Sequence, residues 1–182
     1  MADSVKISKR MSYYLRHGAQ ENGLKIDNGG FIKITDLLKM NDLNGVTFNM
    51  LKYIVDNNDK KRFGISDDDM YVRAVQGHSM NVVKTEELLR ELTIDDNIIE
   101  CYHGTNKNLI SLIMKNGLNK MKRNHVHFSI GQKHDDDVIS GMRNSSNATI
   151  VLDLEGAMND GIKFYISQNN VILSAGIDGI VP

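Results

Sequence analysis

Two adjacent residues of this sequence, an arginine and a histidine, are the first candidates for chemistry. Arg16 and His17 end the stretch MSYYLRHG, in which apolar residues repeat at helical spacing before Gly18. Glycine is common just after a helix, so the pattern places both side chains in the last helical turn. Two interpretations stay open, namely cations that complement the negative end of the helix and a binding site for an anion.

Two further arginines stand in patterns that could bring a cation to a ligand. Arg73 alternates with Val72 and Ala74 in YVRAVQGHS, which predicts that it shares a strand face with Val75 and that this face is buried. A half-buried arginine needs an anionic partner, either an acidic side chain or a ligand phosphate. Arg143 lies in the loop stretch SGMRNSS, where an arginine gains functional weight only from its neighbours. Arginines without paired carboxylates suit phosphate handling better than acid and base cleavage.

Polar residues also stand on two strands predicted in the second half. CYHGT ends with His103, Gly104 and Thr105, and NHVHFS carries His125 and His127 on one face. The three histidines could form a zinc site, but their spacing is not diagnostic and we expect no metal. Hydrogen bonds to a polar ligand are better supported, because Gly104 lets a ligand approach the backbone and Thr105 adds a donor.

Common catalytic and nucleotide-binding motifs are missing from the sequence. The stretch GHSMN at 77–81 does not fit the G-x-S-x-G nucleophile elbow, and Ser79 is predicted to cap the helix that follows. Neither the G-x-G-x-x-G fingerprint nor the G-x-x-x-x-G-K-[ST] loop occurs. These patterns give no support for a hydrolase elbow, a Rossmann site or a P-loop.

Composition is that of a globular protein with a core of its own. The chain has 182 residues, of which 41% are hydrophobic and 25% charged, with a net charge of −1. A single cysteine excludes an internal disulfide, and no apolar run is long enough to span a membrane. No secretory leader is seen, so we expect a cytoplasmic protein without a membrane partner. The basic stretch KNGLNKMKRNH at 115–125 could hold a phosphate-bearing ligand.

The elements that must position these residues change character along the chain. Helices are predicted at 5–17, at TDLLKM, at 47–57 behind the cap Thr47, and in VVKTEELLREL, with a hairpin from RFGIS to MYVRAV. TIDDN at 93–97 reads as a linker, and short strands with one helix, NLISLIMKNGL, follow. The sequence therefore predicts an α+β protein with a mainly helical lobe at 1–95 and a β-rich lobe at 96–182.

Seven stretches taken in order give the sequence a family resemblance. The stretches are SKRMSYYLRHG, GLKIDNGGF, DKKRFGI, RAVQGHS, YHGT, GLNKMKRNHVHFS and SGMR. Together they resemble the NAD-dependent RNA 2′-phosphotransferases. The resemblance runs from about Lys6 to Val181. It implies an N-terminal winged-helix lobe that binds RNA and a C-terminal lobe with the ADP-ribosyltransferase fold.

The resemblance also implies a reaction and its products. An internal RNA 2′-phosphate attacks the nicotinamide-bearing ribose carbon of NAD and expels nicotinamide. The neighbouring ribose hydroxyl then attacks the phosphorus, which releases 2′-hydroxyl RNA and ADP-ribose 1″,2″-cyclic phosphate. NAD is thus a co-substrate, and the partner is an RNA with a 2′-phosphate, such as a tRNA. We expect a monomer, because one chain supplies both lobes.

Site residues follow from the same resemblance. It implies that a tetrad in the cleft between the lobes binds the phosphate, formed by Arg16, His17, Arg73 and Arg143. NAD would be bound by His103, Gly104 and Thr105, with His127 and Ser129 nearby. No transferase glutamate is seen in VILSAG, which argues against a protein ADP-ribosyltransferase.

Three alternatives stay open beside this hypothesis. The first is a non-catalytic module that binds ADP-ribose or phosphorylated RNA. The second is an ADP-ribosyltransferase that acts on nucleic-acid phosphates, and the third is a zinc enzyme built on the histidines.

Overall fold

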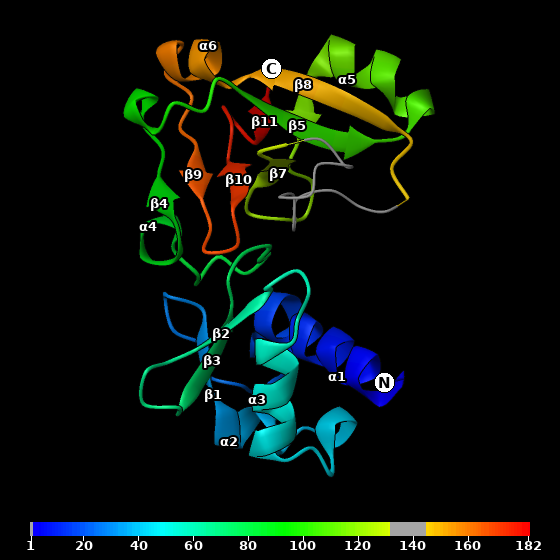
Figure 1. Cartoon of the computed structure of the whole chain (residues 1–182), viewed down its shortest axis with the longest axis vertical. Coiled ribbons are helices and arrows are strands. Elements are labelled where there is room, and N and C mark those ends of the chain that lie inside the picture. Colours follow the sequence, from blue (N-terminus) through cyan, green and yellow to red (C-terminus); the bar gives the residue numbers. More distant parts are fainter. Residues whose placement is uncertain (1, 132–144) are drawn as a thin grey trace. The chain divides into compact units, whose positions relative to one another are not determined.

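Two compact units make up the chain in the computed structural model, which describes residues 2–131 and 145–182 (Figure 1). The units are Met1–Leu88 and Leu89–Pro182, whereas the sequence analysis placed the boundary after residue 95. Each unit has its own buried cluster of apolar side chains. Helices and strands occur in both units, so the predicted mixed α and β character is confirmed.

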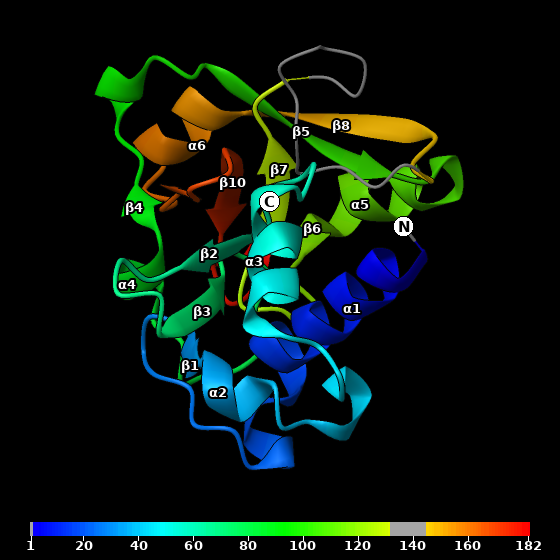
Figure 2. The ribbon, with the colours of Figure 1, turned by 60° about the horizontal axis from the view of Figure 1, so that its bottom comes forward.

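The first unit combines helices with a small antiparallel sheet. Its strand order is β1-β3-β2, and both neighbouring pairs are antiparallel. Figure 2 shows α1 and α3 of this unit in blue and cyan. Its elements are α1 (Ala2–Tyr13), η1 (Tyr14–Gly18), η2 (Gln20–Asn22), β1 (Phe31–Lys33), α2 (Ile34–Leu37), η3 (Asn41–Leu43), α3 (Phe48–Asp56), β2 (Phe63–Ile65), β3 (Tyr71–Ala74) and α4 (Thr85–Leu88).

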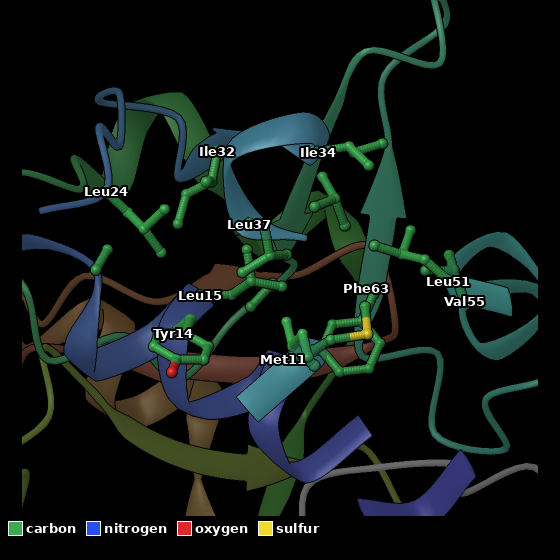
Figure 3. Packing of buried hydrophobic residues seen from close by; sticks show 14 of the residues in the cluster. Met11, Tyr14, Leu15, Leu24, Ile32, Ile34, Leu37, Leu51, Val55 and Phe63 are labelled. Atoms are coloured by element: carbon green, nitrogen blue, oxygen red, sulfur yellow. The ribbon is translucent and has the colours of Figure 1, made fainter. Parts of the chain in front are cut away.

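Apolar residues from every layer of the first unit meet in one core (Figure 3). Met11, Leu15, Leu37 and Leu51 from the helical segments are fully buried in it. Ile32 of β1 is buried with them, so the sheet closes one side of the core. Burying one such side chain contributes roughly 1.5–3 kcal/mol, which makes this cluster the main source of stability in the unit.

Several predicted elements of the first unit are confirmed and some details are wrong. Thr47 accepts a hydrogen bond from the Met50 amide at 3.3 Å, as expected of the cap of α3. Leu51, Ile54 and Val55 of this helix are buried, whereas Met50 is 42% exposed. The helix predicted in VVKTEELLREL is only the four-residue α4, and Arg90–Glu91 forms strand β4 instead. Strand β1, which covers Phe31–Lys33, was not predicted from the sequence.

The helix that carries Arg16 and His17 widens in its last turn. α1 continues without a break into η1, a π-helical turn over Tyr14–Gly18. An ideal Cβ on Gly18 would lie 2.5 Å from the Tyr13 ring, so glycine lets that ring pack against the end of the turn. Single π-turns within helices are frequent at functional sites.

The second unit is built on a six-stranded sheet with the order β4-β9-β10-β7-β5-β8. β5 and β8 run side by side along their whole length (Figure 1). β6 and β11 form a separate two-stranded sheet. The described elements of the second unit are β4 (Arg90–Glu91), η4 (Ile94–Asp96), β5 (Glu100–Thr105), η5 (Lys107–Leu109), α5 (Ile110–Asn116), β6 (Leu118–Asn119), β7 (Val126–Ser129), β8 (Ala148–Asp153), α6 (Leu154–Asn159), β9 (Tyr165–Ile166), β10 (Val171–Ser174) and β11 (Ile180–Val181).

Strand predictions in the second unit are largely confirmed. The stretches CYHGT, VHFS, ATIVLD and VILS lie on strands, and NLISLIMKNGL supplies α5. His125 lies just before β7, so the prediction that it shares a strand face with His127 is wrong. Gly117 ends α5 with a φ of 75°, a conformation that glycine adopts without strain. Phe128, Phe164 and Leu154 are fully buried in the core of this unit. Within residues 2–131 and 145–182, no helix has the length and apolar character to cross a membrane.

Candidate functional site

Arg16 and His17 lie side by side on the π-helical turn but in different surroundings. Arg16 is buried, whereas His17 is exposed. Ser79 is hydrogen-bonded to both residues, because its amide donates to the Arg16 carbonyl at 3.0 Å and its Oγ lies 2.9 Å from His17 Nδ1. The predicted role of Ser79 as a helix cap is wrong, since the next helix, α4, begins at Thr85.

The backbone of Gly77 lies against the Arg16 guanidinium. Gly77 has a φ of 89°, which favours glycine, and an ideal Cβ there would lie 3.4 Å from Arg16 Nε. The chain at 77–79 therefore contacts Arg16 through a glycine and holds His17 through a hydroxyl. The sequence analysis did not predict that this short segment contacts both Arg16 and His17.

Arg73 occupies the sheet face opposite to the core. Val72 and Ala74 are fully buried in the core. On the face of Arg73, Val75 is buried as predicted and Arg73 itself is half-buried. The Arg73 guanidinium carbon lies 4.5 Å from the centre of the Phe31 ring, and Nη1 donates to the Gly29 carbonyl at 3.3 Å. Burial lowers the Arg73 pKa, and the charge of Asp27 opposes that effect. These contacts tie β3 to the turn before β1.

Arg62, which the sequence analysis did not single out, lies on the same sheet face as Arg73. Phe63 pairs with Ala74 on the core face, and the Val75 amide donates to the Arg62 carbonyl at 3.0 Å, so alternation turns Arg62 away from the core. Within the described part of the chain, the Arg62 guanidinium has no hydrogen bond or ion pair. Burial lowers its pKa, and the charge of Asp59 only partly offsets this.

A second cation lies close to Arg62. The pKa of Lys60 is lowered by burial and then by the positive charge of Arg62. Two like charges held together and partly desolvated are costly unless an anion joins them. The run DKKRFGI carried this signal in the sequence, because three consecutive cations precede a buried phenylalanine. Arg62 is therefore a candidate phosphate ligand.

In the second unit, two predicted ligand residues meet where β5 and β7 part. Tyr102 and Ser129 form the one register pair between these described strands. Beyond it, His103 Nδ1 lies 2.8 Å from the His127 carbonyl. A carbonyl only accepts, so His103 carries a proton on Nδ1, and Nε2 is an acceptor in the neutral ring. The His103 side chain thus supplies a hydrogen bond to β7 where the backbone pairing between β5 and β7 has ended.

Arg123 joins His127 at this place. Arg123 Nη1 lies 3.4 Å from His127 Nε2, and a guanidinium can only donate, so His127 accepts with an unprotonated Nε2. The sequence analysis placed Arg123 in a basic stretch but did not name it as a site residue. The described site in this unit therefore combines a cation with two oriented imidazoles, a set that suits phosphate and ribose oxygens.

The remaining predicted residues of this unit have different surroundings. Gly104 lies opposite Thr149 in the β5–β8 ladder, and Thr105 is buried at the end of β5. Ser129 is fully buried, with its hydroxyl 2.7 Å from the Gly131 carbonyl, so this hydroxyl supports the chain after β7. The prediction that these three residues contact a cofactor stays a prediction.

Two predictions concern Arg143 and metal binding. Arg143 lies outside the residues that the structure describes. Among the described residues, no group of three or more His, Cys, Asp or Glu side chains is placed to hold a metal ion. His125 lies just before β7 and is buried, with its ring centre 6.3 Å from that of Tyr165.

Comparison with known proteins places these residues in a family context. The family described as RNA 2'-phosphotransferase, Tpt1 / KptA family, matches residues 2–176. A putative tRNA 2'-phosphotransferase of Schizosaccharomyces pombe is 41% identical over 98% of this chain, which spans 49% of that protein. The tRNA 2'-phosphotransferase 1 of Danio rerio is 38% identical over 94% of this chain and 78% of its own length.

A bacterial relative shows the same similarity. The probable RNA 2'-phosphotransferase of Flavobacterium johnsoniae is 37% identical over 92% of this chain and 89% of its own length. The matched region includes both units, with Arg16, His17 and Arg62 in the first and His103, Arg123 and His127 in the second. This chain belongs to the RNA 2'-phosphotransferase, Tpt1 / KptA family.

Proposed function

We propose that this protein is an NAD-dependent phosphotransferase that removes an internal 2′-phosphate from RNA, with tRNA as a substrate. The family match over residues 2–176 carries the proposal. The 2′-phosphate attacks the nicotinamide-bearing ribose carbon of NAD, and nicotinamide leaves with the bond electrons. The adjacent ribose hydroxyl then attacks phosphorus, and the RNA leaves with a free 2′-hydroxyl.

Residues of the first unit bind the RNA phosphate in this proposal. Arg16 and His17 lie next to each other on one turn. The half-buried Arg62 guanidinium, which has no hydrogen bond or ion pair among the described residues, supplies a second bidentate donor. The attraction of a bound phosphate would offset the cost of desolvating the Arg62 guanidinium, which is the cause of its lowered pKa. The helices and three-stranded sheet of this unit support a winged-helix lobe. Arg143 stays a predicted phosphate ligand, and the contacts of Arg73 favour a structural role.

Residues of the second unit bind NAD in this proposal. Where β5 and β7 part, His103, Arg123 and His127 present polar groups beside strand backbone. The Arg123 guanidinium suits the diphosphate, and the acceptor Nε2 of His103 suits a ribose hydroxyl. The β-rich character of this unit supports the predicted ADP-ribosyltransferase-like lobe. No side chain is needed as a nucleophile, because the substrate phosphate is the nucleophile.

The test is incubation with NAD and an oligonucleotide that carries one internal 2′-phosphate. We expect loss of the 2′-phosphate, one nicotinamide for each phosphate removed, and ADP-ribose 1″,2″-cyclic phosphate. The control oligonucleotide lacks the 2′-phosphate and should release no nicotinamide. Persistence of the 2′-phosphate without nicotinamide release would contradict the proposal. ADP-ribose binding without turnover would then identify a binding module, and ADP-ribose left on the RNA would identify an ADP-ribosyltransferase.

A further inference from the structure

Ser79 is hydrogen-bonded to His17, an exposed residue of the candidate phosphate site. Its Oγ lies 2.9 Å from His17 Nδ1, across 62 residues of sequence. The Ser79 amide also donates to the Arg16 carbonyl at 3.0 Å, so the serine is attached to the turn by its backbone. An exposed imidazole would otherwise sample several rotamers. This bond restricts the ring to one orientation.

The chemistry of a hydroxyl makes serine suitable for this contact. A hydroxyl can donate to a neutral imidazole or accept from Nδ1–H of an imidazolium, so the bond survives when His17 gains or loses a proton. Because Ser79 binds Nδ1, Nε2 is the ring nitrogen that we assign to the substrate. A carboxylate in this place would favour the charged ring, and an apolar side chain would leave the ring unoriented.

We propose that Ser79 is the positioning residue of His17, which it orients so that Nε2 meets the RNA phosphate. This inference rests on the proposed function and adds a residue to its machinery. In this proposal the effect of Ser79 on the reaction passes through its contact with His17. The π-helical turn and the contact of Gly77 with Arg16 hold the serine at the required place.

Kinetics of four proteins test whether the effect of Ser79 passes through His17. Single-turnover rates are compared for the unmodified protein, Ser79→Ala, His17→Ala and the double variant, at saturating NAD and 2′-phosphorylated oligonucleotide. We expect Ser79→Ala to lower the rate about 10-fold or more while KM for NAD is unchanged, and Ser79→Thr to restore most of it. The Ser79→Ala effect should vanish in the His17→Ala background. An equal loss in both backgrounds would overturn the proposal.

A spectroscopic measurement tests the contact without any activity. The 15N resonances of the His17 ring report which of its two nitrogens is protonated. We expect Ser79→Ala to change the balance between the two tautomers, and Ser12→Ala on α1, a matched serine control, to leave it unchanged. Identical His17 resonances in the Ser79→Ala protein would overturn the proposal even if the enzyme were active. A changed spectrum without any phosphotransfer in the unmodified protein would retain the contact and reject the proposed function.

Discussion

His103 Nδ1 donates a hydrogen bond to the backbone carbonyl of His127 at 2.8 Å. The bond forms just beyond Tyr102 and Ser129, where the ladder between β5 and β7 stops. A side chain of one strand thus satisfies a carbonyl that its neighbour's backbone leaves without a ladder partner. The His127 carbonyl therefore keeps a hydrogen-bond donor at the place where the ladder stops.

Replacing His103 by phenylalanine tests its role in the second unit. His103→Phe keeps a ring against Phe128, which the histidine ring contacts at 5.9 Å, but removes the Nδ1 donor and the Nε2 acceptor. We expect KM for NAD to rise roughly 10-fold, equivalent to about 1.4 kcal/mol and typical of one lost hydrogen bond. Steady-state kinetics with varied NAD measures it. An unchanged KM for NAD in a folded variant would remove His103 from the NAD site.

Arg62 and Arg73 lie on one sheet face but should respond differently to truncation. We expect Arg62→Ala to lower kcat roughly 100-fold, the size seen when a donor to developing charge is removed, with little change in thermal stability. The reason is that the Arg62 guanidinium has no partner within the described residues that its loss would disturb. Single-turnover phosphotransfer and thermal unfolding are measured on the same samples.

Arg73→Ala provides the matched comparison. Removing Arg73 loses its stacking on Phe31 and its bond to the Gly29 carbonyl, so we expect a loss of about 1 kcal/mol in unfolding free energy. The fall in kcat should be smaller than that of Arg62→Ala. A larger fall in kcat for Arg73→Ala, with stability intact, would assign the phosphate to Arg73, as the sequence resemblance implied.

The contrast between these arginines shows what a single sequence can and cannot predict. Alternation predicted the strand that carries Arg73 but not which of its two faces meets the core. That choice is set by register, because pairing of Phe63 with Ala74 turns both side chains inward and leaves Arg62 and Arg73 outside. Local patterns do not contain that register.

Elements with local signals were predicted well, and contacts between distant residues were not. Thr47 at the start of α3 and Gly117 at the end of α5 are capping residues that act within a few positions of themselves. The hydrogen bond between His17 and Ser79 joins residues 62 positions apart, and the sequence favoured a local role for the serine. Chemistry-bearing residues were found by type, but their partners needed the fold.

Gly77 should be intolerant of a side chain. Its φ of 89° strains any other residue, and Arg16 lies directly beside it. We expect Gly77→Ala to lower the unfolding free energy by about 1 kcal/mol and to reduce phosphotransfer by displacing Arg16. Gly45→Ala serves as the control. Gly45 has a similar φ of 81°, but an ideal Cβ there has none of the described atoms beyond its chain neighbours within 4 Å. Equal activity of the two variants would show that the contact with Arg16 has no functional weight.

Acid should destabilise the second unit through His125. Burial, and then the charge of Lys120, lower its pKa from 6.5 to about 4. Between these two pH values His125 is mainly protonated in the unfolded chain and mainly neutral in the folded chain. His125 therefore contributes stability above pH 6.5 that is lost as the pH falls toward 4.

Replacing His125 by phenylalanine should remove this pH dependence. The unmodified protein should lose about 2 kcal/mol more unfolding free energy than His125→Phe between roughly pH 7 and 4.5, because each unit of pKa difference is worth about 1.4 kcal/mol. Urea unfolding followed by circular dichroism at a series of pH values measures the difference. Parallel pH profiles for the unmodified protein and His125→Phe would show that His125 takes up its proton equally well in both states, and they would contradict the prediction.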